Sequence, residues 1–364
     1  MDQNGGPRSP CASMRRASLL ISCLACAAAA WVVPTAASSM PRRSDRGVRP
    51  VPVPAAGRPV DTSRANPVVG HGTAASCTSA AVVAAVRAGG LIRFSCGRKP
   101  VTIRMSATAK VMNTSRQVVL DGGGLVTLSG EGRQRILYMD TCDQAQVWTT
   151  SHCQDQATPE LVVENLTFAD GNSTGQEFDG GGGGAIFARG GRLRIVNSVF
   201  TGNRCDRDGP DIGGGAVRAL SEYDNLPVYV VGSRFTGNVC SNGGALSSIG
   251  VSWTVLNSRF DANRAIGIGA NPAQTGTPGG GSGGAIYNDG DLMQLSISGS
   301  SFVDNTANEG GGAIFFVSDD RTGTMSITDS ALQRNRSDRF QTAGLPGIFF
   351  LGARHPTITG SVLR

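Results

Sequence analysis

The sequence is poor in aromatic and charged residues. Of its 364 residues, 5% are Phe, Trp or Tyr and 16% are Asp, Glu, Lys or Arg, whereas 51 are Gly. The glycines show no Gly-X-Y period, which excludes a collagen-like chain, and 40% of the residues are hydrophobic, enough for a core. We therefore expect the glycines to mark ordered turns.

The main part of the chain also lacks an excess of positive charge. The net charge of +6 comes entirely from residues 1–37, with a net charge of +2, and residues 38–67, with +4. Residues 68–364 carry 24 basic and 24 acidic residues. A nucleic-acid-binding domain concentrates positive charge on its folded face, so this distribution argues against a nucleic-acid partner.

Long apolar runs are absent outside the N-terminal region. Arg15 and Arg16 precede an apolar stretch from Leu19 to Val33, and small residues follow it up to Ala37. This pattern predicts a secretory signal peptide over residues 1–37, with an N-terminal extension before Met14. The stretch is shorter than the ~20 residues that a membrane span requires, so we expect no transmembrane segment in the mature chain and a secreted or cell-surface location.

Domain boundaries follow from composition. Residues 38–67 are rich in Pro and Arg and nearly free of bulky apolar residues, which predicts a disordered linker. Residues 68–364 would then form the folded domain.

Six cysteines remain after the predicted leader, and an even number in an exported chain indicates disulfides. Among the six, no C-x-x-C pair or histidine lies at zinc-ligand spacing. Cys205 and Cys240 each lie five residues after a repeated phenylalanine, so stacked repeats would bring them within disulfide distance. Cys77–Cys96 and Cys142–Cys153 follow as local pairs.

An internal repeat dominates the second half of the chain. Each copy begins with Gly-Gly-Ala and an aliphatic residue and ends with Phe or Leu followed three residues later by Asn. The repeat alanines lie 31, 29, 40 and 28 residues apart. They are Ala185, Ala216, Ala245, Ala285 and Ala313.

Short alternating strands lie between these anchors, and no helical period intervenes, which excludes leucine-rich and doubly wound α/β folds. A coil that returns above itself forms parallel strands with turns alone, so the repeat predicts an all-β, right-handed parallel β-helix of about eight coils. Like residues would stack. The expected interior stack comprises Phe200, Phe235, Phe260 and Phe302, and the expected amide ladder comprises Asn203, Asn238, Asn263, Asn305 and Asn335.

The Gly-Gly-Ala and Phe-x-x-Asn motifs resemble those of the chlamydial polymorphic outer-membrane proteins over about residues 162–336. The resemblance implies a β-helix and an adhesin-like role. The N-terminal region is similar to the opening coils of pectin-lyase-like proteins: residues 79–88 would form a short helix that caps the stack, and 91–94 its first strand.

Two acidic turns are the candidate catalytic site. Glu177 and Asp208 each lie eight residues before a repeat alanine, and Asp179 and Asp211 lie at nearly equivalent places. Stacked turns would gather these carboxylates on one edge, where they could bind Ca²⁺ or divide into acid and base, or form only a solvated turn. No confident metal site is predicted.

Candidate ligand contacts are aromatic platforms at Trp148 and Tyr138 and cationic partners at Arg189 and Arg218. The leading functional prediction is adhesin-like or polysaccharide binding along the flat side of the helix, with a cell-surface glycan as partner. The alternatives are a lyase or hydrolase acting on acidic glycans, and a structural envelope component without a ligand.

Overall fold

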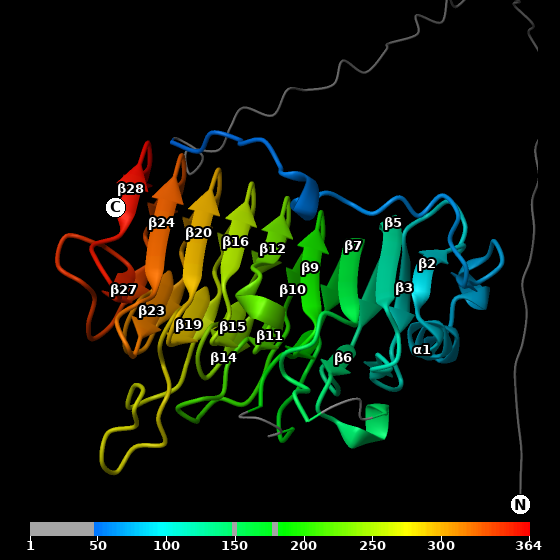
Figure 1. Cartoon of the computed structure of the whole chain (residues 1–364), viewed down its shortest axis with the longest axis horizontal. Coiled ribbons are helices and arrows are strands. Elements are labelled where there is room, and N and C mark those ends of the chain that lie inside the picture. Colours follow the sequence, from blue (N-terminus) through cyan, green and yellow to red (C-terminus); the bar gives the residue numbers. More distant parts are fainter. Residues whose placement is uncertain (1–46, 148–150, 177–180) are drawn as a thin grey trace, which may run out of the picture. The chain divides into compact units, whose positions relative to one another are not determined.

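The computed structural model describes residues 47–147, 151–176 and 181–364. The predicted leader, residues 1–37, lies outside these ranges. Nearly all elements are β-strands, and every ladder between named strands is parallel. Successive coils stack along one axis from β2 to β28 (Figure 1). The predicted parallel β-helix is therefore confirmed.

One sheet of the β-helix takes one strand from each coil. This eight-stranded sheet matches the expected number of coils. Its members are β4 (Ala109–Lys110), β6 (Leu137–Asp140), β8 (Ile186–Arg189), β11 (Val217–Leu220), β15 (Leu246–Ile249), β19 (Ile286–Gly290), β23 (Ile314–Ser318) and β27 (Ile348–Leu351).

A 17-stranded sheet forms a second side and bends at a turn in each coil. Before the bend lie β1 (Val68–Val69), β2 (Gly90–Phe94), β9 (Arg192–Val196), β12 (Val228–Val231), β16 (Trp253–Leu256), β20 (Gln294–Ser298), β24 (Thr324–Thr328) and β28 (Thr357–Thr359), and two longer strands, β5 (Gln117–Ser129) and β7 (Glu160–Ala169), run through it. After it lie β3 (Val101–Arg104), β10 (Val199–Thr201), β13 (Arg234–Thr236), β17 (Arg259–Asp261), β21 (Ser301–Val303), β25 (Ala331–Gln333) and β29 (Val362–Leu363). A four-stranded sheet of β14 (Val239–Cys240), β18 (Arg264–Ala265), β22 (Thr306–Ala307) and β26 (Arg336–Ser337) completes the coils.

The interior is built from stacked like residues. The rings of Phe200, Phe235, Phe260 and Phe302 lie 4.5–4.8 Å apart and within 4° of parallel. Phe168 extends this stack at one end and Leu332 pairs with Phe302 at the other. Each ring is fully buried, so the stack supplies much of the apolar core.

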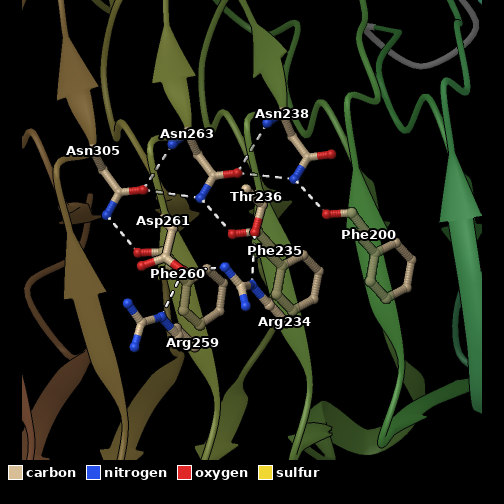
Figure 2. A network of polar contacts seen from close by, with 10 residues as sticks. All are labelled: Phe200, Arg234, Phe235, Thr236, Asn238, Arg259, Phe260, Asp261, Asn263 and Asn305. Carbon is tan, nitrogen blue, oxygen red and sulfur yellow. Dashed lines mark hydrogen bonds and ion pairs between the residues drawn. The ribbon is translucent and has the colours of Figure 1, made fainter. Parts of the chain in front are cut away.

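The asparagine ladder runs beside the phenylalanine stack (Figure 2). Asn238 Nδ2 donates to Asn263 Oδ1 at 2.9 Å and to the backbone carbonyl of Phe200 at 3.1 Å. Asn263 repeats both bonds, one coil later, to Asn305 and Phe235. The ladder satisfies turn carbonyls that the strands leave unpaired, since buried backbone groups require partners.

The Gly-Gly-Ala turns require glycine at both positions. The first glycine has positive φ, as in Gly243 at +51°. A Cβ on the second would collide with backbone of the next coil, as Gly244 would with Arg264. The turn therefore brings coils into close backbone contact.

A second ladder, of serines, was not predicted. The backbone N–H of Ser198 donates to Ser233 Oγ at 3.1 Å, and Ser233 and Ser258 repeat the bond. Each Oγ also donates to the carbonyl two residues earlier. The members are Ser198, Ser233, Ser258, Ser300, Ser330 and Ser361.

The N-terminal end of the stack is capped as expected. Helix α1 (Ser79–Ala88) begins after Thr78, whose Oγ1 accepts a bond from Ala81 N–H, and it buries Val82 and Val86 against the first coils. The structure contains the Cys77–Cys96, Cys142–Cys153 and Cys205–Cys240 disulfides. The last joins adjacent coils, with Cα atoms 4.8 Å apart.

The predicted disordered linker is wrong for residues 47–67, which pack against the β-helix. This segment, here called the strap, runs along the outside of the β-helix from the end of β24 to β2 (Figure 1). Val51 and Val53 pack on an outward apolar strip of Val196, Val231 and Leu256. The strap has few bulky apolar residues, but two of them, Val51 and Val53, are partly buried on this strip.

Candidate functional site

The predicted acidic edge is only partly within the described ranges. Glu177 and Asp179 lie outside them. Asp211 is exposed and half-exposed Asp208 has Arg207 Nε at 3.8 Å, an exposed ion pair of small energetic value. Among the described residues, no cluster of three or more His, Cys, Asp or Glu side chains could hold a metal ion. Calcium binding or catalysis at this edge stays a prediction.

Two predicted ligand contacts are corrected by their burial. Tyr138 is 6% exposed, its ring stacks on Phe187 at 5.5 Å, and its hydroxyl donates to Asp140. Arg218 is fully buried and donates to Ser247 Oγ at 2.6 Å. Burial therefore leaves neither side chain open to a polysaccharide.

The other two ligand predictions are not decided by burial. Arg189 is half-buried at the end of β8, beside Asp140. Burial raises the pKa of Asp140, and the positive charge of Arg189 offsets part of that rise. Trp148 lies outside the described residues. Their roles in ligand binding stay predictions.

The outer face of β16, β20, β24 and β28 carries a row of hydroxyl groups. The strand ladders align Thr254 with Ser296, Ser296 with Ser326 and Ser326 with Thr357. We call these four residues the hydroxyl row. None is buried, and neighbouring coils lie about 4.8 Å apart, so the row presents one hydroxyl group per coil at a regular spacing.

The same row of positions continues into a cleft. Thr254 aligns with Tyr229 on β12, and Tyr229 aligns with Arg194 on β9. There the β-helix forms a cleft of about 400 Å³. Its lining consists of Ala56, Glu160, Arg192, Leu193, Arg194, Glu222, Leu226, Pro227 and Tyr229.

Glu160 organises one wall of the cleft. Its carboxylate accepts bonds from Arg194 Nη2 at 2.9 Å, Gln117 Nε2 at 2.9 Å and Arg192 Nη2 at 3.4 Å. Arg194 Nη1 also donates to the carbonyl groups of Ala56 and Arg58 in the strap. Glu160 and Arg194 are therefore fixed by their partners, whereas the side chain of Arg192 remains 40% exposed.

Glu222 also lines the cleft. It is 6% exposed, and the backbone N–H of Leu193 donates to its carboxyl group. Its Oε1 is buried without a hydrogen-bond partner within the described part of the chain. Burial raises the pKa of Glu222 well above its usual value, against the lowering effect of Arg192.

Sequence reasoning missed this cleft because its charged residues come from separate coils. Glu160 and Arg192 are brought together by the pairing of β7 with β9. Glu222 lies in the loop between β11 and β12, where no residue of the repeat motif falls. The available signal was the Arg-x-Arg pair on an otherwise apolar strand.

Comparison with known proteins gives one family match. Residues 299–317 match the model of the Chlamydia polymorphic membrane protein (Chlamydia_PMP) repeat. The chain resembles that repeat family. The match includes Phe302 and Asn305 of the two ladders and the following Gly311-Gly312-Ala313 turn. No curated protein and no solved structure matches the chain.

No helix in the described ranges is long and apolar enough to cross a membrane.

Proposed function

We propose that this protein is a secreted or surface-displayed β-helix that binds polysaccharide along the hydroxyl row, without cleaving it. The observation that carries the proposal is the alignment of Thr254, Ser296, Ser326 and Thr357 on consecutive coils. A polymer with repeated hydroxyl groups can make the same hydrogen bond to every coil. Many weak, equally spaced contacts would then add along one chain.

The rigidity of the scaffold supports this role. The strands beneath the row are held by the Phe, Asn and Ser ladders, so the hydroxyl groups are positioned before the ligand arrives. Preorganised contacts lose less entropy on binding. The neighbouring positions Ser298, Thr328 and Thr359 add a second line of hydroxyl groups.

Export agrees with the chemistry of the chain. Three disulfides fit an oxidising compartment. The predicted leader and the match to a repeat named for Chlamydia membrane proteins support a location at the cell surface. An adhesin-like role would follow if the polysaccharide belonged to another cell.

Affinity electrophoresis of the full chain in gels containing neutral or acidic polysaccharides tests the proposal. We expect retention by at least one polysaccharide, and at least about tenfold weaker retention of a Ser296→Ala, Ser326→Ala, Thr357→Val triple variant. A Thr201→Val, Thr306→Val double variant is the control, since it removes half-buried hydroxyl groups outside the row. Equal retention of the triple variant and the parent chain would contradict the proposal.

A further inference from the structure

The cleft beside the hydroxyl row has the features of a binding site of its own. Glu222 is more than nine-tenths buried, lines the cleft and has no hydrogen-bond partner for Oε1 among the residues that the structure describes. A buried polar atom without a partner costs free energy unless a ligand satisfies it. The volume of about 400 Å³ falls within the usual range for small-molecule sites.

We propose that this cleft is a subsite for one neutral sugar unit, whose hydroxyl groups are bound by the Glu222 carboxyl group and the Arg192 guanidinium. The inference rests on the proposed polysaccharide binding and names the sugar class at one end of the hydroxyl row. Tyr229 connects the two, because it lines the cleft and aligns with Thr254.

The charges of the cleft favour a neutral ligand. Two carboxyl groups, of Glu160 and Glu222, face two guanidinium groups, of Arg192 and Arg194. A uronic acid would bring its carboxylate beside Glu160 and Glu222, and an amino sugar would bring its ammonium group beside both arginines. A hydroxyl group suits both partners, since it accepts from a guanidinium and donates to a carboxyl oxygen.

The apolar lining completes a sugar-like environment. Leu193, Leu226, Pro227 and the Tyr229 ring supply non-polar surface for the C–H groups of a sugar ring. Leu226 is 43% exposed, so a ligand in the cleft would cover apolar surface that is now in water.

Titration calorimetry on the full chain tests the subsite, with neutral hexose or pentose oligosaccharides and an oligogalacturonate of equal length as probes. We expect a neutral oligosaccharide to bind more tightly than the oligogalacturonate. Glu222→Leu and Arg192→Gln should each weaken that binding about tenfold, whereas Glu222→Gln, which keeps a hydrogen-bonding group, should stay within about threefold. Arg87→Gln, which changes an exposed arginine of helix α1, is the matched control for loss of an arginine.

Leu226→Arg keeps the test decisive if Glu222→Leu does not fold. This exposed position tolerates a polar residue, and the long side chain would fill the mouth of the cleft, so binding should fall by the same factor. Unchanged affinity in Leu226→Arg and Arg192→Gln, or a preference for the oligogalacturonate, would overturn the subsite. If the triple variant of the hydroxyl row alone weakened binding, polysaccharide binding would stand and the subsite would fail. If no saccharide bound the parent chain, both would fail.

Discussion

Asn257 binds the backbone of Val51 across 206 positions of sequence. The Val51 N–H donates to Asn257 Oδ1 at 2.8 Å, and Asn257 Nδ2 donates to the Val51 carbonyl oxygen at 2.9 Å. This pair fixes the strap to the turn after β16. Side chains of the β-helix bind the backbone of the strap elsewhere too, as Arg194 binds the Arg58 carbonyl group and Glu164 binds the Val60 N–H.

Asn257→Ala should release this part of the strap without unfolding the β-helix. Two hydrogen bonds are lost, each contributing about 1 kcal/mol. We expect amide hydrogen exchange at residues 49–53 to accelerate about tenfold or more, while the core strands stay protected. Asn197→Ala is the control, because Asn197 has the same left-handed turn conformation as Asn257 but donates from Nδ2 to Asn165 of the neighbouring coil. Equal exchange in both variants would refute the role of Asn257.

Glu164 should make stability depend on pH. Burial raises the pKa of Glu164 from 4.5 to about 6, partly offset by the hydrogen bond from Val60 N–H. The folded state therefore holds this proton more tightly than the unfolded state. The stabilisation is fully present below pH 4.5 and is lost as the pH rises through about 6.

Glu164→Gln should remove that dependence, since the amide oxygen can still accept from Val60. Compared with the parent chain, we expect a gain of roughly 1–2 kcal/mol in the free energy of unfolding at pH 7 and little difference at pH 4. Urea unfolding at both pH values measures this. A variant that is less stable at pH 7 would contradict the assignment.

Phe235→Ala should be among the most destabilising single changes. The ring is buried between Phe200 and Phe260 at 4.7 and 4.8 Å, so truncation leaves a cavity that the stacked coils cannot close. We expect a loss of about 3–5 kcal/mol in urea unfolding. Phe349→Ala, at a half-buried position on β27, should cost clearly less. Equal losses of stability in the two variants would show that the phenylalanine stack contributes no more than a half-buried aromatic residue.

Asn263→Asp tests the amide ladder. The carboxylate can still accept from Asn238, but it cannot donate to Asn305 Oδ1 or to the Phe235 carbonyl group. We expect a loss of at least about 3 kcal/mol at pH 7, with partial recovery at pH 4 when the buried carboxyl group is protonated. The same change at half-buried Asn335 should cost less. A loss at Asn263 that does not vary with pH would argue against a role for its donor group.

The repeat predicted the interior well because stacking turns sequence period into spatial contact. Phe200 and Phe235 are 35 positions apart and directly paired, as are Cys205 and Cys240. The serine ladder carried a comparable signal, a serine after each left-handed turn residue. It was missed because serine is common in turns and its bonds are not apparent from composition.

The strap and the cleft could not be predicted in this way. Val51 and Val53 have no period, and their partners Val196, Val231 and Leu256 are outward positions that composition alone assigns to solvent. Tyr138 and Arg218 were expected to contact a ligand, the first as an aromatic platform and the second as a cationic partner, but both are buried. Glu222 comes from the loop between β11 and β12. Contacts made by loops and straps depend on three-dimensional packing that the repeat does not encode.

Polysaccharide binding without cleavage is tested most directly by incubating the full chain with a panel of neutral and acidic polysaccharides, with and without Ca²⁺. Retention of the protein and the chain length of each polysaccharide would be measured together. We predict retention on a neutral polysaccharide whose chain length does not change, with or without Ca²⁺. Calcium-dependent shortening of an acidic polysaccharide, or no retention on any member of the panel, would contradict the proposal of polysaccharide binding without cleavage.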